Sequence, residues 1–488
     1  MKNEQSRAPA RGWVKKALCS GVVLAMSVAA TSAVAGNKKG EEFNEFTPVS
    51  RIAQIPVVRD EKGHVDYKAS YAWARAASVA VATYVARMRE YDSVGPEIEG
   101  KDWKLGGTSE DCISDSSTCT NLEIDEAVLK IPSPDPIDPN DPAGFNEDGT
   151  VTKANTKKAN VLDFCNKKYA SLAMGVAPII DDKYVVNGYS HAPALPCEVS
   201  IWLDDNKINV DMLNPEAIFT LFFSDVLFSE EMQDKDFADE LNAMTVKVNN
   251  EIRATIYAAL TYHGYDHTVV DKEVGPVYGS MKDIINVVAS STYQSPYKHM
   301  SYTRGGGGTF TAKESKAVAQ TIINTLSTHE DSPGVHPTII NEITGETLDS
   351  ILSPNSSWRS ARIAPISIPG KNHIIEACSP KYAKMAMSTG LSHVNALPCE
   401  ITVNTIDGGN KLVVSYLDPD FMLKSLFADI SNKDKKEFGD IPGIIMTDLQ
   451  NVVKAALDNV YVDNEDGTSY PLTFDPGVQI SYDMLPQE

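Results

Sequence analysis

A ten-residue segment that occurs twice constrains the fold of this chain more than any other feature of its sequence. Residues 190–199 read SHAPALPCEV, residues 392–401 read SHVNALPCEI, and seven of the ten positions are identical. Upstream of each, residues 161–170 (VLDFCNKKYA) recur as residues 374–383 (IIEACSPKYA). Two matching blocks in the same order indicate an internal duplication. We therefore expect two copies of one domain, so that a fold for one copy accounts for much of the chain.

The repeat also divides the chain into domains. A length of 488 residues exceeds that of one ordinary domain. We place the first copy at residues 45–260, with a Pro/Asp-rich loop at residues 131–150, and the second copy at residues 290–488. Residues 261–289 are assigned to a connecting segment.

Alternating apolar residues predict an antiparallel hairpin in each copy. Val199, Ile201 and Leu203 alternate with polar residues, and the alternation resumes at Ile208 after an Asp-Asp-Asn turn. The second copy repeats the pattern around the turn at residues 407–410.

Capping signals predict helices around these hairpins. Residues 214–215 (Asn-Pro) and 418–419 (Asp-Pro) each place a capping side chain before a proline at the first helical position. Long helices are expected near residues 71–89 and 311–326, the second with a capping box at its start. The apolar run at residues 218–223 is expected in the core or between the copies. The predicted fold class is therefore α+β, with two tandem copies of a small helix-plus-antiparallel-sheet sandwich.

These motifs resemble one known family. The string Cys-(Asn/Ser)-x-Lys-Tyr-Ala, then Leu-Pro-Cys and a strand that ends in (Asn/Asp)-Pro, is similar to the domain-of-unknown-function family 302, and both copies carry it. Lys167 departs from the usual proline of the family, and His191 and His393 are not expected of it. The resemblance implies a compact α+β fold. Because the family has no established activity, the resemblance implies no reaction, and its intracellular members imply that the paired cysteines are not structural disulfides in every case.

The first 35 residues predict a secretory signal peptide. A basic stretch precedes an apolar run from Ala17 to Ala30, and Ala33-Val34-Ala35 supplies the small residues of a cleavage site. Polar residues interrupt the run, which is too short for a retained anchor. Cleavage after Ala35 removes five basic residues and one acidic residue, which moves the formal net charge from −22 to −26. We expect a periplasmic or secreted bacterial protein without stable membrane insertion, whose acidic surface excludes nucleic-acid partners.

An even number of cysteines in an oxidising compartment favours disulfides. The repeat pairs Cys165 with Cys197 and Cys378 with Cys399, which leaves Cys112 with Cys119. Closing loops of 32 and 21 residues in the two copies would stabilise each by roughly 3–4 kcal/mol in the chain-entropy model.

A redox or metal site is the alternative for the same residues. His191 and His393 each lie six residues before a cysteine, so Cys165, His191 and Cys197, or Cys378, His393 and Cys399, would offer three ligands to zinc or copper. A repeated histidine can equally cap the loop by hydrogen bonding. Glu198 and Glu400 follow the cysteines and are interpreted as solvent-facing strand residues.

The sequence therefore predicts a non-catalytic binding or structural module, exported and tied by disulfides within each copy. An unidentified small molecule or protein would bind in a groove between the copies. No cofactor is predicted, and no motif of a known enzyme class was found. A periplasmic redox or metal-handling protein remains the alternative.

Overall fold

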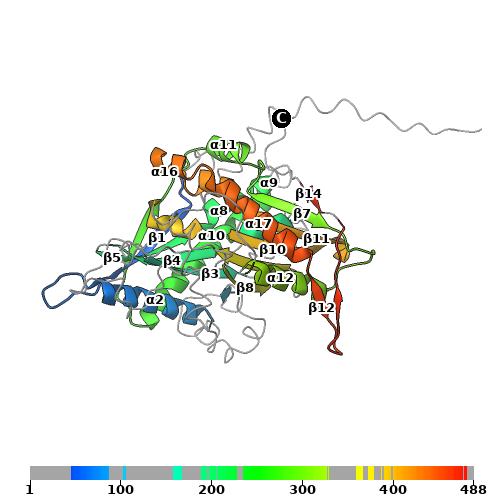
Figure 1. Cartoon of the computed structure of the whole chain (residues 1–488). Coiled ribbons are helices and arrows are strands. Elements are labelled where there is room, and N and C mark those ends of the chain that lie inside the picture. The colour runs from blue at the N-terminus through cyan, green and yellow to red at the C-terminus, as the bar shows by residue number, and fades with distance from the viewer. Residues whose placement is uncertain are drawn as a thin grey trace, which may run out of the picture.

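The computed structural model describes residues 45–86, 103–105, 158–166, 188–194, 197–204, 206–227, 235–326, 328, 359–365, 372–378, 386, 389–396, 399–475 and 477–480. Within these residues the protein is a mixed α+β fold with two six-stranded sheets and a small hairpin (Figure 1). No helix in this part of the chain is long and apolar enough to cross a membrane.

The two large sheets have corresponding strand orders. The first has the order β2 (Trp103–Leu105), β3 (Lys158–Asn166), β4 (Cys197–Leu203), β5 (Lys207–Leu213), β1 (Val49–Pro56) and β6 (Thr268–Val274). The second has the order β8 (Arg359–Pro365), β9 (Asn372–Cys378), β10 (Cys399–Ile406), β11 (Lys411–Leu417), β7 (Tyr297–Tyr302) and β14 (Val478–Ile480). Neighbouring strands pair antiparallel in both. The separate hairpin consists of β12 (Tyr461–Asp463) and β13 (Ser469–Pro471).

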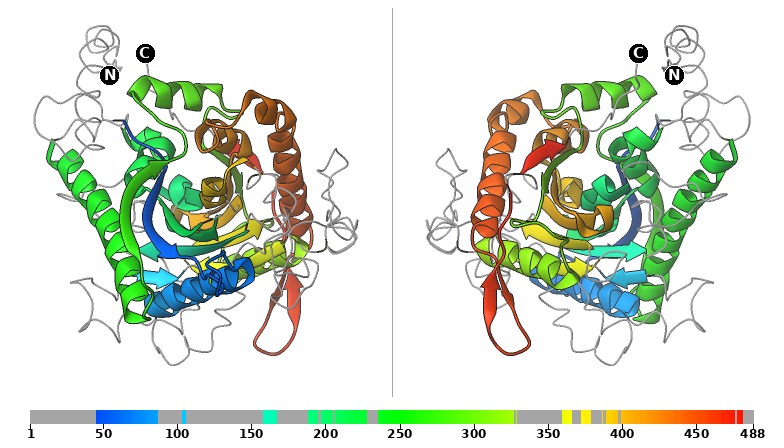
Figure 2. Two further views of the ribbon diagram at one scale, coloured as in Figure 1. Left: turned by 90° about the vertical axis from the view of Figure 1, so that its left-hand side faces the viewer. Right: turned by 90° about the vertical axis from the view of Figure 1, so that its right-hand side faces the viewer.

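Long helices cover the outer face of each sheet. Helix α2 (Tyr67–Ala86) contacts β3 and β4 and packs beside α10 (Lys235–Tyr262), whereas α12 (Ala312–Leu326) contacts β8, β9 and β10 and packs beside α17 (Ile441–Leu457). In Figure 2, α10 and α17 stand on opposite sides of the molecule with the strands between them. The apolar alternation of the hairpins packs with these helices. Val199 and Ile201 share a core cluster with buried residues of α2, and Ile401 and Val403 share one with buried residues of α12 and α17.

Short helices fill the space between the sheets. They are η4 (Gly188–Ala194), α8 (Pro215–Phe222) and α9 (Ser224–Leu227) in the first half, and η6 (Leu391–Ala396) and α15 (Pro419–Ser425) in the second. Helix η4 packs against β10 and β11 of the second sheet, and η6 packs against β3, β4 and β5 of the first. The described residues also form α11 (Met281–Ser290), η7 (Asp407–Gly409) and α16 (Asn432–Glu437).

The described residues form two core clusters, one within the second half and one that includes residues of both halves. The rings of Phe222 in α8 and Phe421 in α15 meet edge to face with centroids 5.1 Å apart, and both side chains are buried. The Tyr297 hydroxyl of β7 donates a hydrogen bond to the Phe222 carbonyl oxygen at 2.8 Å. The apolar run at residues 218–223 therefore lies in the core and also contacts the second half.

Several predictions of local structure are confirmed. Asn214 and Asp418 cap α8 and α15 through their side chains, with proline at the first helical turn in both. The capping box of α12 is formed, since the Thr311 hydroxyl accepts from the Glu314 amide and the Glu314 carboxylate accepts from the Thr311 amide. Both predicted hairpins are present as β4–β5 and β10–β11. Residues 261–289, assigned from sequence to a connection, contribute β6 to the edge of the first sheet and include α11.

Candidate binding site between the two sheets

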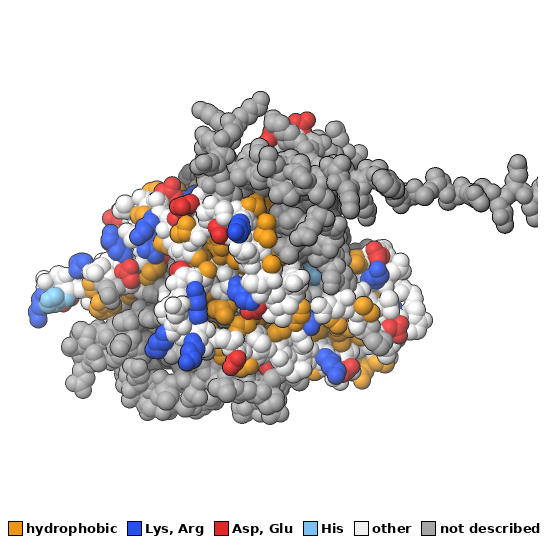
Figure 3. All heavy atoms as spheres, turned by 90° about the horizontal axis from the view of Figure 1, so that it is seen from above, with side chains coloured by type: hydrophobic (Ala, Val, Ile, Leu, Met, Phe, Trp, Pro, Cys, Tyr) orange, Lys and Arg blue, Asp and Glu red, His pale blue; other side chains and the backbone are white. Residues whose placement is uncertain are grey.

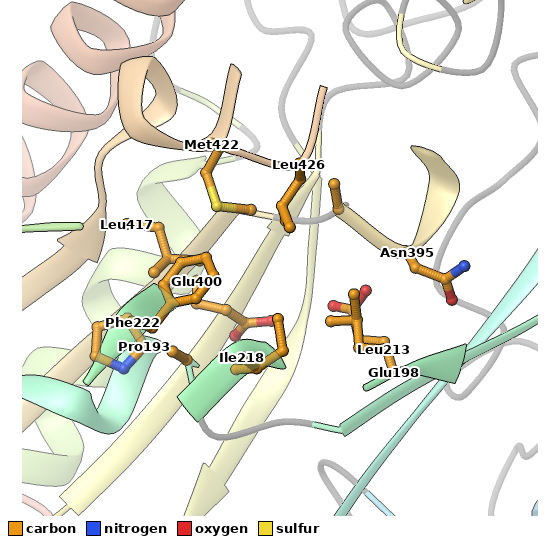
Figure 4. A pocket seen from close by; sticks show the side chains of 12 residues that line it. Pro193, Glu198, Leu213, Ile218, Phe222, Asn395, Glu400, Leu417, Met422 and Leu426 are labelled. Carbon is orange, nitrogen blue, oxygen red and sulfur yellow. The ribbon is translucent and has the colours of Figure 1, made fainter. Parts of the chain in front are cut away.

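A small cavity of about 30 Å³ lies where the two halves meet (Figure 4). Its lining combines η4, β4, β5 and α8 of the first half with η6, β10, β11 and α15 of the second. The twelve lining residues form six pairs at corresponding positions of the sequence repeat: Pro193 and Asn395, Ala194 and Ala396, Glu198 and Glu400, Leu213 and Leu417, Ile218 and Met422, Phe222 and Leu426. The cavity therefore receives matching positions from both halves.

Two buried glutamates are the charged groups of this lining. Glu198 is 6% exposed and Glu400 is 2% exposed, and Figure 4 shows both carboxyl groups among the lining side chains. The interpretation of these residues as solvent-facing was wrong. Each is the second residue of its strand and lies on the face opposite to Val199 or Ile401, and that face is covered by the other half of the molecule rather than by water.

The rest of the lining is mostly apolar. Among the described residues that line the cavity, none is Lys, Arg or His, and the uncharged polar member is Asn395. Carboxylates in such surroundings lose hydration, and two of them also repel each other.

The repeated histidines lie beside the cavity and are held in the same way. The His191 Nε2 atom lies 2.7 Å from Asp225 Oδ1, and the His393 Nε2 atom lies 2.8 Å from Asp429 Oδ1. Because a carboxylate only accepts hydrogen bonds, each Nε2 carries the proton and donates it. The sequence left this hydrogen-bonding role open beside metal ligation.

An aromatic ring supports each histidine. His191 stacks on Phe223 with ring centroids 4.2 Å apart, and His393 lies tilted on Phe427 at 4.7 Å. The second ring nitrogen of His393, Nδ1, lies 2.7 Å from the Thr389 hydroxyl. Both ring nitrogens of His393 are thus within hydrogen-bonding distance of protein atoms.

The two histidine–aspartate bonds differ in exposure. The Asp225 side chain is 2% exposed and the Asp429 side chain is 37% exposed. Burial alone would raise the pKa of the Asp429 carboxyl, but the hydrogen bond and charge of His393, with the charge of Lys435, bring that pKa below its usual range.

The inner faces of the sheets carry further buried polar groups. On the first sheet the Asp211 carboxylate accepts from Arg51 at 2.8 Å and from the Trp202 indole at 2.9 Å. On the second, His299 Nδ1 lies 2.8 Å from the Ser415 hydroxyl. Burial, together with the charge of His191, lowers the pKa of His299 to about 3, so this imidazole is neutral at physiological pH.

The cysteines of the repeat lie on the same strands as the glutamates. Cys197 begins β4 opposite Phe164, the neighbour of Cys165, and Cys399 begins β10 opposite Ala377, the neighbour of Cys378. The side chains of these four cysteines, and Cys112 and Cys119 entirely, lie outside the described residues. The disulfide and metal assignments therefore stay predictions. Within the described part of the chain, no group of three or more His, Cys, Asp or Glu side chains is placed to hold a metal ion.

Sequence reasoning missed Asp225 and Asp429. A signal was present, because residues 223–226 (Phe-Ser-Asp-Val) align with residues 427–430 (Phe-Ala-Asp-Ile) without a gap from the two Pro-capped helices. The aromatic residue and the acid recur at the same spacing in both halves, which marks them as partners of the recurring histidine.

The segment that contains the second half of this site matches a known family. Residues 366–446 match the family described as "Domain of unknown function DUF302", and they include His393, Glu400 and Asp429. Comparison of the chain with curated proteins and with solved structures gave no match.

Proposed function

We propose that this protein is an exported, non-catalytic binding protein whose two halves are copies of one domain and jointly bind a primary ammonium group. The observation that carries the proposal is the pair of buried glutamates, Glu198 and Glu400, at corresponding positions of one cavity. The ligand would be a small amine, or a larger molecule that presents an aminomethyl end.

The duplication is supported by more than the repeated motifs. The strand orders of the two sheets correspond position by position. The first residue after each hairpin, Asn214 or Asp418, donates its amide to the carbonyl of a proline just before the strand beside it, Pro48 at 2.8 Å and Pro296 at 2.7 Å. This bond extends the correspondence to β1 and β7, where the sequences have diverged. On this proposal the two copies meet at a shared site, and the paired lining of the cavity supports it.

The charge of the lining favours a cationic ligand. Two carboxyl groups in a mostly apolar cavity are costly to keep ionised unless a positive charge compensates them, and the lining supplies no basic side chain from the described residues. On this proposal, a cationic ligand places its positive charge between the two carboxyl groups.

Hydrogen-bonding geometry favours an ammonium group over a metal ion. An –NH₃⁺ group has three donors, and the lining contains two carboxyl groups, Glu198 and Glu400, and the amide of Asn395. Because each carboxylate or amide oxygen accepts more than one hydrogen bond, these groups can accept from an ammonium group in addition to their partners in the protein. Hard divalent cations prefer about six to eight oxygen ligands, more than this lining provides. Ile218, Met422 and their neighbours give the carbon next to the nitrogen an apolar contact. A space of about 30 Å³ suits a group of this size, since one water needs roughly 10–15 Å³.

Export and disulfides complete the proposal. The signal sequence directs the chain to the periplasm or the exterior, and the cysteine pairs Cys165–Cys197 and Cys378–Cys399 would tie the strands that carry the two glutamates. Lys, Arg, Asp and Glu side chains are interspersed over the described surface in Figure 3. This mixture of charges is ordinary for a protein whose ligand binds inside rather than on a charged outer face.

A thermal-stability screen tests the ligand class. Ammonium, methylammonium, ethylammonium, tetramethylammonium, Mg²⁺, Ca²⁺ and Zn²⁺ would each be added to the purified mature protein at constant ionic strength. We expect methylammonium to raise the melting temperature, tetramethylammonium to have no effect because it has no N–H donor, and Glu198→Gln/Glu400→Gln to abolish the shift. Glu273→Gln, on the exposed strand β6, is the matched control and should respond like the wild type. Stabilisation by a metal ion alone, or a shift that survives the double substitution, would refute the proposal.

A further inference from the structure

Each 3₁₀ helix that carries a repeated histidine also forms part of the cavity wall. Pro193 and Ala194 follow His191 in η4, and Asn395 and Ala396 follow His393 in η6. The position of each histidine therefore fixes the position of lining residues two and three places further along the chain.

The aspartate partners belong to a second wall segment of the same half. Asp225 follows α8, which contributes Ile218 and Phe222 to the lining, and Asp429 follows α15, which contributes Met422 and Leu426. In each half, one histidine–aspartate bond thus ties together two segments that line the cavity.

Each tied segment also reaches across the molecule. Helix η4 packs on strands of the second sheet and η6 on strands of the first, close to the strands that carry Glu400 and Glu198, respectively. If a histidine–aspartate bond breaks, the wall it holds can move away from the opposite sheet, and the acceptors of the cavity lose their alignment.

The two bonds are not equally protected. His191 and Asp225 are buried, and the stacked Phe223 ring covers the imidazole. Asp429 is 37% exposed, so water competes for its carboxylate. Ion pairs that water reaches contribute little to global stability, whereas breaking a buried pair is strongly destabilising.

We propose that His191 and His393 are positioning residues for the cavity. The His393–Asp429 bond positions the part of the lining that comes from the second half and contributes little to global stability. The His191–Asp225 bond positions the part of the lining that comes from the first half and also stabilises the fold. This inference rests on the proposed function for its ligand readout, but not for its structural readout.

The test uses the mature protein and Asp429→Ala, with Asp429→Asn as the conservative control. Asparagine keeps an oxygen that can accept from His393 Nε2. Amide hydrogen exchange of residues 391–396, methylammonium affinity and the urea midpoint would be measured for each protein. For Asp429→Ala we expect about tenfold faster exchange in residues 391–396, about tenfold weaker methylammonium binding and an almost unchanged urea midpoint. Asp429→Asn should restore most of both losses.

The outcomes separate the two proposals. Unchanged exchange in residues 391–396 of Asp429→Ala, or equal losses in Asp429→Ala and Asp429→Asn, would overturn the positioning role. Failure of the wild type to bind methylammonium, with the exchange result as expected, would refute the proposed ligand and leave the positioning role standing. Asp225→Ala should lower the urea midpoint itself, and a midpoint equal to that of the wild type would contradict the difference between the two bonds.

Discussion

The first sheet buries a charged pair where the second sheet buries a neutral one. Arg51 of β1 lies opposite Asp211 of β5, and His299 of β7 lies opposite Ser415 of β11, at corresponding positions of the two strand orders. Arg51 and Asp211 form an ion pair at 2.8 Å, whereas the neutral His299 imidazole bonds a hydroxyl. The same backbone register thus occurs with a charged pair and with a neutral pair. The two pairs should respond differently to the loss of one partner.

The largest expected effect comes from breaking the charged pair. Arg51→Met leaves Asp211, whose side chain is fully buried, without its counter-charge, and should lower the free energy of unfolding by about 3–5 kcal/mol. His299→Met removes a neutral hydrogen bond and should cost about 1–2 kcal/mol. Urea unfolding at pH 7 measures both. Arg51→Met/Asp211→Asn should recover part of the loss, and equal costs for the two single variants would show that the charge of the first pair has no special importance.

A second difference lies at the caps of α8 and α15. Asn214 caps the first helix and Asp418 caps the second, and both side chains accept a backbone amide two residues later. Burial raises the pKa of Asp418 to about 6, although the cap hydrogen bond to the Asp420 amide opposes the shift. The folded state therefore binds this proton more tightly than the unfolded state, whose aspartate has a pKa near 3.8.

The sign of the pH effect follows from this shift. The contribution of protonated Asp418 to stability is complete below about pH 4 and is lost as the pH rises through about 6. Asp418→Asn should therefore match the wild type near pH 4 and exceed its stability at pH 7 by up to about 3 kcal/mol. Asn214→Asp makes the reverse exchange in the first half and should lower stability at pH 7. A stability difference between Asp418→Asn and wild type that stays constant from pH 4 to pH 7 would contradict the raised pKa.

The smallest expected effect concerns the exposed histidine–aspartate bond. A methyl group added at Gly390 would lie 3.2 Å from Cε1 and Nδ1 of the His393 ring, closer than such contacts usually are. Gly390→Ala should push the imidazole from its place and lower the urea midpoint only slightly, by less than about 1 kcal/mol in free energy. The change should appear chiefly as an altered imidazole resonance of His393 in the NMR spectrum. A spectrum identical to that of the wild type would contradict the prediction that the added methyl group displaces the His393 ring.

Sequence reasoning predicted what depends on local chemistry. The Pro-capped helices, the capping box of α12 and both hairpins follow from residues that interact with near neighbours, and all are present. It could not predict which face of each hairpin meets the other half. Glu198, Ser200 and Asp211 alternate with apolar residues just as solvent-facing residues would, yet all three are buried in the folded protein.

The edge strand β6 was not predicted as a strand because its residues are mostly exposed. Its sequence, TVVDKEV, is charged and largely exposed, so it carries no apolar alternation that would distinguish it from a connection. Pairing with β1 places it in the sheet. The glutamates of the candidate site were misinterpreted for a related reason, since a buried acid between two halves has the same local sequence as an exposed one.

Titration calorimetry of methylammonium into the wild type, Glu198→Gln and Glu400→Gln tests the central claim most directly, because the two carboxyl groups come from different halves and are compared one at a time. We predict that each single substitution weakens binding by at least about tenfold, as expected for the loss of a charge-assisted hydrogen bond, and that the two losses are similar. A loss confined to one variant would contradict a site shared by both halves, and binding unaffected by either substitution would contradict the site altogether.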